Sequence, residues 1–162
     1  RSTLFPYTTL FRSTNRTVKD VLAPLGSVRF DAVAMSPGRQ LGVGTVEGTP
    51  IFCLPGDPVS AQIAFETFVR PVLRQIAGWS ALHRSSLPAV VSAGWRSPAG
   101  KREFVPVHLT GSPTRGYRAS PVAAPGTTPL LGLARANAIA VVPEDTRTVV
   151  AGDRLHCLLL DA

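Results

Sequence analysis

Apolar residues near the start of the chain follow first the period of a helix and then that of a strand. Spacings of three and four over residues 14–25 predict an amphipathic helix, for which Thr14 or Asn15 is a suitable N-cap. Alternation of apolar residues over 28–35 predicts a strand. The Pro-Gly pair within residues 36–40 predicts a loop after it.

Two further apolar runs, 41–46 and 50–54, are separated by Glu47, Gly48 and Thr49. Strand-like runs joined by so short a connection containing glycine are typical of a β-hairpin. We therefore expect two antiparallel strands in this part of the chain.

A long helix is predicted directly after the hairpin. Asp57 is a favoured N-cap, Pro58 suits the first helical position, and helical spacing of apolar residues continues to about Ala77. Pro71 should kink or split this helix because proline lacks the N–H that an internal turn requires, and Gly78 should end it. The predicted apolar stripe consists of Ala61, Phe65, Phe68, Val72 and Ile76, and the predicted solvent face of Gln62, Glu66, Arg70 and Arg74.

The pattern changes after Trp79. Residues 80–86 are polar and are interpreted as a linker. From Leu87 onward, short apolar runs alternate with turn sequences, which is typical of a small, mainly β domain. The turns fall at 97–100, 111–116 and 124–129, a short helix is expected at 129–136, and later strands are expected at 138–142 and 154–160. The prediction for the whole chain is an α/β domain followed by a small mainly β domain.

The first 13 residues, RSTLFPYTTLFRS, contain the triplet TLF twice. They share no pattern with the sequence that follows. We interpret residues 1–13 as translated adapter or tag sequence and exclude them from the prediction of the fold.

Composition indicates a folded protein and leaves its partner open. The chain is 44% hydrophobic and 17% charged, which suits a globular core. Its formal net charge of +7 comes mostly from arginine and favours anionic partners, either nucleic acid or a phosphorylated small molecule. The alternative is arginine scattered over a solvated surface, because the charges form no block.

Several classes of protein are disfavoured by what the sequence does not contain. No apolar run approaches the roughly 20 residues that span a bilayer, and the start does not resemble a secretory leader. Two cysteines, Cys53 and Cys157, do not make a disulfide framework or a metal site. His156 and Cys157 fall in an apolar strand pattern, and both are expected to be packing residues. A cytoplasmic setting is expected.

The run LPGDPVSA over residues 54–61 is the most informative segment. A strand ends, Pro-Gly turns the chain, and a helix begins, so that Gly56 and Ser60 lie where free N–H groups can bind an anion. Asp57 opposes this interpretation, because its carboxylate repels anions and takes one N–H as the N-cap. The alternative is ordinary punctuation between a strand and a helix.

One basic position is a further candidate for binding an oxyanion. Arg39 lies on the loop before the hairpin, and arginine can clamp an oxyanion through two N–H groups. The alternative is a solvated loop arginine. A second basic cluster, Lys101, Arg102 and Glu103, lies just after a turn and is typical of a solvated hairpin end.

These segments, in this order, resemble one family. The stretches VRFDAVAMSPGRQLGVG and IFCLPGDPVSAQIAFETFVRPVLRQIAG are similar to the end of the molybdopterin-binding domain of MoeA-type molybdopterin molybdenumtransferases and of gephyrin. RSPAGKREF, GTTPLLGLARANAIAVVP and AGDRLHCLLL are similar to that family's C-terminal β domain. The resemblance implies part of a molybdopterin-binding domain over 14–79, a linker over 80–86, and a barrel-like β domain over 87–162.

The resemblance also implies a reaction in molybdenum cofactor biosynthesis. Molybdate is inserted into adenylylated molybdopterin and AMP is released, with Mg²⁺ as the usual cation. Carried over residue by residue, Gly56, Asp57 and Ser60 match the phosphate-side turn. The positions that match those near molybdate are Ser36, Arg39, Arg102, Thr127 and Thr128. No metal ligand and no catalytic residue is assigned.

This sequence departs from the family pattern at several of these positions. Asp57 stands where the family usually has asparagine, which adds a negative charge. Ser36 and Arg39 stand where the family usually has two lysines, and Gln40 replaces a proline. Arginine binds oxyanions differently from lysine, so the basic loop is changed as well as weakened.

The resemblance covers only the later part of the family's chain. We therefore expect a fragment with half an active site that does not turn over alone, and a homodimer only in the full-length protein. Neither nucleic acid nor a membrane is an expected partner. The competing hypotheses are a molybdopterin adenylyltransferase-like activity, a basic module that binds anions or nucleic acid without catalysis, and a scaffolding role like that of gephyrin.

Overall fold

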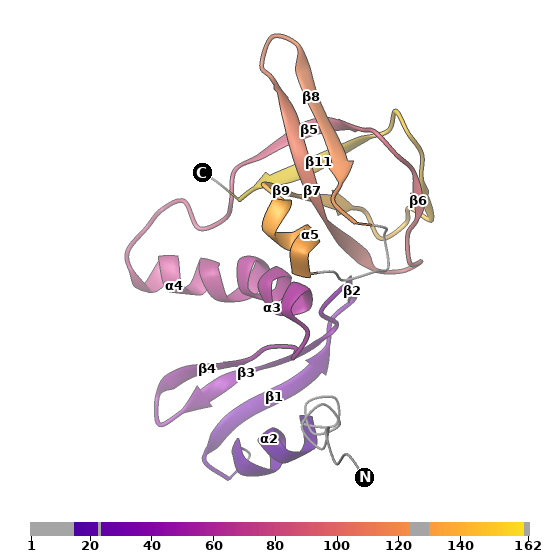
Figure 1. The fold of residues 1–162 in the computed structure, drawn as a ribbon. Coiled ribbons are helices and arrows are strands. Elements are labelled where there is room, and N and C mark those ends of the chain that lie inside the picture. Colours follow the sequence, from indigo (N-terminus) through magenta and orange to yellow (C-terminus); the bar gives the residue numbers. More distant parts are fainter. Residues whose placement is uncertain (1–14, 23, 124–129, 161–162) are drawn as a thin grey trace.

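The computed structural model describes residues 15–22, 24–123 and 130–160. In Figure 1, a small sheet with one helix lies at the N-terminal end and a mainly β part at the C-terminal end. A long helical segment lies between these two parts and contacts the second. This arrangement confirms the predicted α/β part followed by a mainly β part.

The N-terminal part contains the helix α2 (Asn15–Leu22) and an antiparallel sheet in the order β1-β3-β4. Helix α2 ends three residues before the predicted Leu25, because Pro24 cannot supply the N–H of a further turn. Thr14, one of the two expected N-caps, lies outside the described residues. The strands are β1 (Gly26–Ala32), β3 (Gln40–Val46) and β4 (Thr49–Cys53).

The predicted hairpin is confirmed. Strands β3 and β4 pair from Val46 and Thr49 outward, and a two-residue turn joins them. Glu47 and Gly48 have φ values of 48° and 78°, so both residues adopt the left-handed conformation that suits the twist of a tight hairpin.

The strand predicted over 28–35 is divided in two. Strand β1 ends at Ala32, and β2 (Met35–Ser36) pairs with the C-terminal part of the chain instead of with β3. The interruption coincides with a tight local turn, in which the N–H of Met35 donates to the carbonyl of Val33 at 2.8 Å. The chain thus leaves one sheet and joins another within three residues.

The long helix comprises α3 (Pro58–Ala64), a π-helical turn η1 (Phe65–Val69) and α4 (Arg70–Ile76). The wide turn accommodates Pro71, because the N–H of Arg70 donates to the carbonyl of Phe65, five residues back. The predicted disruption at Pro71 therefore takes the form of a π-helical turn. Gly78, with a φ of 78°, follows the helix as predicted.

Most of the predicted assignment of faces in this helix is wrong, although Phe68 of the predicted apolar stripe does pack against a buried cluster. Val59, Ile63 and Ala64 are buried, whereas Phe65 is 38% exposed and Ile76 is 69% exposed. The side chains of Glu66 and Arg70, expected in solvent, are only 7% and 14% exposed. Helical spacing alone could not choose between two faces that both contain apolar residues, and the wide turn rotates the faces relative to one another.

The C-terminal part is built from strands β5 (Ser86–Val91), β7 (Arg102–Ser112), β8 (Gly116–Pro121), β9 (Ala138–Val142) and β11 (Arg154–Leu159). Among the described residues these strands follow the order β7-β8-β5-β11-β9, and β9 pairs again with β7. The sheet therefore closes on itself around a core of small and branched apolar side chains. The short strands β6 (Trp95–Arg96) and β10 (Thr148–Val149) pair beside it.

The elements expected in this half agree closely with the structure. Helix α5 (Leu130–Arg135) lies within the predicted range 129–136, β9 matches its prediction, and β11 ends one residue early at Leu159. The turn at 124–129 lies outside the described residues. In β11, Cys157 is fully buried as expected and burial raises the pKa of its thiol to about 11, but His156 faces solvent.

Neither cysteine forms a disulfide within the structure: Cys53 is partly exposed and Cys157 is buried. Burial also raises the pKa of the Cys53 thiol. No helix in the described ranges has the length and apolar character that a membrane span requires.

The two parts are joined by backbone pairing and by packing. Strand β2 pairs in parallel with the start of β7, so that Met35 lies beside Arg102 and Ser36 beside Glu103. A separate apolar cluster combines residues from β2, from the long helix and from the closed sheet. Its fully enclosed members are Met35, Val59, Ile63 and Ile139.

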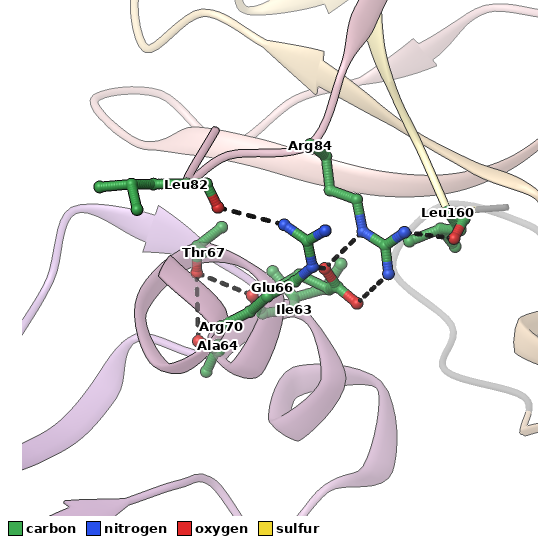
Figure 2. A network of polar contacts seen from close by, with 8 residues as sticks. All are labelled: Ile63, Ala64, Glu66, Thr67, Arg70, Leu82, Arg84 and Leu160. Carbon is green, nitrogen blue, oxygen red and sulfur yellow. Dashed lines mark hydrogen bonds and ion pairs between the residues drawn. The ribbon is translucent and has the colours of Figure 1, made fainter. Parts of the chain in front are cut away.

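A buried carboxylate reinforces this contact (Figure 2). The Glu66 side chain accepts hydrogen bonds from Arg84 at 2.9 and 3.0 Å, and Arg70 lies 3.7 Å from it. Arg84 also donates to the carbonyl of Leu160, and Arg70 donates to the carbonyl of Leu82 at 3.1 Å. One acidic group on the helix thereby holds both the segment after the helix and the end of the closed sheet.

Exchanging Ile63 for alanine should destabilise the chain by about 2–5 kcal/mol, because the side chain is fully enclosed between the helix and the β part. Ile76→Ala, on the same helix but mostly exposed, should cost less than about 0.5 kcal/mol. Urea denaturation curves measure both. Equal losses for the two variants would contradict the assignment of the buried face.

Glu66→Ala should cost about 3 kcal/mol, because two poorly solvated arginines lose their partner. The matched control is Asp31→Ala, which breaks an exposed pair with Arg29 and should cost less than about 1 kcal/mol. Hydrogen exchange should also show faster opening around Leu82 and Leu160 in the Glu66 variant. Unchanged protection there would show that the carboxylate does not hold these segments.

Candidate functional site

The turn that precedes the long helix is closed by Asp57. Its backbone is extended, with φ −78° and ψ 128°, and its carboxylate accepts the N–H of Ser60 at 2.8 Å. The carbonyl of Asp57 accepts the N–H of Ala61, also at 2.8 Å. Asp57 is therefore the predicted N-cap, with Pro58 at the first helical position.

Ser60 is bound more tightly to Asp57 than the sequence suggested. Its hydroxyl donates to the same carboxylate oxygen at 2.5 Å, and the residue is only 7% exposed. An anion therefore cannot receive the hydroxyl proton of Ser60 unless Asp57 releases it. Gly56 lies exposed in the turn just before, where the backbone is accessible to a ligand.

The loop over residues 36–39, here called the SPGR loop, packs directly against this helix start. Gly38 has a φ of 91°, and a Cβ at this position would lie 3.1 Å from the carbonyl oxygen of Ser60. A side chain here would therefore meet both backbone strain and a close contact. Ser36 and Pro37 are joined by a cis peptide bond, and Arg39 projects at the exposed end of the loop.

Arg102 reaches the same loop from the other part of the chain. Its N–H donates to the carbonyl of Ala34 at 3.0 Å, one residue before β2. Its guanidinium binds Glu144 through contacts of 3.1 and 3.2 Å, and both side chains are 55% exposed. The pKa of Glu144 is held below its usual value, first by a hydrogen bond from its own backbone and then by Arg102.

Arg102 and Glu144 border a cavity of about 370 Å³ between the two parts. The segment 33–35 lines one side of this cavity, and Thr67 and Phe68 of the long helix line another. The cavity is mostly apolar apart from this ion pair. An oxyanion that binds Arg102 there must share the guanidinium with Glu144 or displace it.

The structure brings together most of the residues predicted for the site. Ser36 is next to the Arg102–Glu103 pair through β2 and β7, and the SPGR loop contacts Ser60 through Gly38. Gly56 and Ser60 do not line the cavity that Arg102 borders. The candidate site therefore has two halves, the helix start and the cavity, and the loop over residues 36–39 lies between them. Thr127 and Thr128 lie outside the described residues.

Two acidic residues lie near Arg102: the sequence predicts a solvated hairpin end at Glu103, which is wrong, and makes no prediction for Glu144. Glu103 is 7% exposed and accepts a hydrogen bond from the Trp95 indole at 2.9 Å. Alternation along β7 could have indicated its burial, because Val105 and Val107 share its face. No local sequence pattern indicated Glu144, because its contact with Arg102 joins residues 42 positions apart.

Comparison with known proteins defines the class of this fold. Residues 12–75 match the family model described as "Probable molybdopterin binding domain", and residues 88–160 match "MoeA C-terminal region (domain IV)". A solved molybdopterin biosynthesis MoeA protein from Pyrococcus horikoshii superposes with a TM-score of 0.73 at 24% identity, over 88% of this chain and 34% of that one. This likeness shows the fold alone.

Two relatives from Mycobacterium tuberculosis H37Rv are more similar in sequence. The protein named molybdopterin molybdenumtransferase 2 is 43% identical over 129 residues, which are 80% of this chain and 31% of the relative. Molybdopterin molybdenumtransferase 1 is 35% identical over 146 residues, covering 84% of this chain and 33% of the relative. The chain belongs to the MoeA-type molybdopterin molybdenumtransferase family and spans about a third of the length of these relatives.

Asp57→Ala should cost about 0.5–2 kcal/mol, because the variant loses the N-cap and leaves the hydroxyl of Ser60 without its acceptor. Asp57→Asn keeps an oxygen acceptor at the cap and should cost clearly less. Thermal denaturation of the two variants measures the difference. If asparagine proves as harmful as alanine, the negative charge rather than the cap stabilises this turn.

Proposed function

We propose that this chain supplies the molybdate-facing part of an enzyme that inserts molybdate into adenylylated molybdopterin and releases AMP. Membership of the MoeA-type family makes molybdenum cofactor biosynthesis the setting. The observation that carries the proposal is the parallel pairing of β2 with β7, by which the SPGR loop and Arg102 meet although they belong to different parts of the chain.

In this proposal the two arginines compensate negative charge. Arg39 stands exposed beside the helix start, and Arg102 stands at the cavity between the parts. Molybdate and the phosphates of the substrate are all anionic, so the reaction must hold like charges close together. Guanidinium groups at both edges lower that repulsion by pairing with the anions.

The helix start has a positioning role in the proposal. Gly56 offers exposed backbone for the phosphate side of the pterin, while Asp57 and Ser60 fix the turn and pack it against the loop at Gly38. Ser36, beside Glu103, places the start of the loop next to Arg102. Thr127 and Thr128 remain proposed molybdate-side hydroxyls on the strength of the resemblance.

Magnesium is the cation that the resemblance implies, and no ligand for it is assigned among the described residues. They contain no group of three or more His, Cys, Asp or Glu side chains that could hold a metal ion. Asp57 is bound to Ser60, and Glu144 is bound to Arg102.

Two alternatives are less well supported. The sister reaction, adenylylation of molybdopterin, is expected of a single-domain protein, whereas residues 88–160 match a second domain typical of MoeA. A module for nucleic acid would need clustered basic and aromatic residues on one face. The arginines of the candidate site belong to a cavity and a loop between two parts of the chain instead.

A homodimer and a cytoplasmic location are also proposed for the full-length protein. The dimer is supported by exposed apolar side chains on the N-terminal sheet and on the last part of the long helix, which a second subunit would cover. They include Val43, Leu73, Ile76 and Trp79, with exposed fractions between 41% and 69%. Sedimentation of the full-length protein tests the dimer.

The function is tested with the full-length protein encoded by the uninterrupted reading frame. It should convert adenylylated molybdopterin and molybdate to molybdenum cofactor and AMP, whereas the isolated 162-residue chain should not. Arg102→Gln should lower kcat/KM by about 10²–10³, as for loss of one charge-stabilising donor, and Arg102→Lys should restore part of it.

Arg96→Gln is the matched control, because Arg96 is exposed on β6 and six residues from Arg102. It should leave kcat/KM unchanged. Full activity of the Arg102→Gln enzyme would contradict the role assigned to this arginine. Absence of AMP release from the full-length protein would overturn the proposed reaction itself.

A further inference from the structure

A second basic cavity lies on the closed sheet, away from the candidate site. It has a volume of about 620 Å³ and is bordered by β5, by the β7–β8 hairpin and by the start of β11. In Figure 1 this hairpin projects beyond the rest of the C-terminal part. The cavity shares no lining residue with the one that Arg102 borders.

The cavity is a fork between two strands. The parallel strands β5 and β8 pair only through Val90 with Arg118 and through Val91 with Ala119. Strand β5 begins four residues before that contact and β8 begins two residues before it, and these ends line the cavity without pairing with each other. The fork therefore exposes polar backbone next to the side chains around it.

Three arginines surround this fork. Val90 of β5 is paired with Arg118 on β8 and with Arg154 on β11. Paired residues on neighbouring strands project from the same face of a sheet, so the two arginine side chains leave the same face. Their backbones are about 10 Å apart, which is twice the spacing between strands. Arg115 joins them from the turn of the hairpin. Among the described residues that line the cavity there is no Asp or Glu, and none of the three arginines forms an ion pair within the described part.

The edge of β5 disfavours a peptide as the occupant. The carbonyl of Ser85 and the N–H of Val91 both form hydrogen bonds towards β11. The backbone polar groups of successive residues point to opposite sides of a strand, so those of residue 88 point towards the fork. Residue 88 is proline, which has no N–H to offer to an added strand. An occupant must therefore be held by the arginines and not by a ladder of backbone hydrogen bonds.

We propose that this fork binds a small molecule that carries a di- or triphosphate. Three cationic side chains without carboxylate partners match an ion with several negative charges, and guanidinium binds phosphate oxygens in pairs. The volume is within the range of small-molecule sites. The site is separate from the one proposed for molybdate and does not depend on it.

The test is a calorimetric titration of the 162-residue chain with inorganic pyrophosphate at about 0.15 M ionic strength, where long-range attraction is screened. Saturable binding is expected. The double variant R118Q/R154Q should weaken it at least about tenfold, because each hydrogen bond to a charged group contributes roughly that factor. R118K/R154K should fall between the two, and it keeps the charge if the glutamine variant fails to fold.

Arg29→Gln is the control, since Arg29 is 84% exposed on β1 in the other part of the chain. It should bind pyrophosphate like the wild type. The proposal is overturned if the wild type shows no saturable binding, if R118Q/R154Q and R118K/R154K both bind unchanged, or if Arg29→Gln weakens binding equally. Displacement of pyrophosphate by a lower concentration of hexaglutamate would also overturn it, in favour of an acidic peptide.

Discussion

The candidate site depends on the helix 58–76 being held against the closed sheet. The carboxylate of Glu66 lies in this contact with two arginines, and Ile63 is enclosed one turn away. The helix carries the Asp57 turn at its start, while the sheet carries Arg102. This contact and the pairing of β2 with β7 together fix the relative position of the two halves of the site. A charge network and an apolar cluster together hold the helix against the closed sheet.

The chemistry of the site follows from which charges are already satisfied. Asp57 binds Ser60, and Glu144 binds Arg102, so each local carboxylate has a partner within the protein. A bound oxyanion would compete with Glu144 for Arg102, which makes binding an exchange of one negative charge for another. The displaced carboxylate of Glu144 would stay in the chain beside the cavity, so the proposed binding adds negative charge there.

The excess of positive charge has a structural distribution that composition alone cannot describe. Arg39 and Arg102 lie where the two parts of the chain meet, whereas Arg115, Arg118 and Arg154 surround the fork on the closed sheet. Arg70 and Arg84 form ion pairs with Glu66 in the buried network. Arginine thus tethers the buried contact, and in the two proposals it also neutralises substrate charge and binds phosphate.

The sequence by itself determined the elements whose signals are local. The hairpin at Glu47-Gly48, the cap at Asp57, the disruption at Pro71 and most strands of the second half follow from propensity, turn chemistry and period. The motifs also indicated the family and most of the candidate residues. The tertiary structure decided which helix face is buried, that β2 leaves its expected strand, and that Glu144 faces Arg102. These outcomes depend on contacts between residues far apart in the chain, and a local pattern contains no information about which distant partner will cover it.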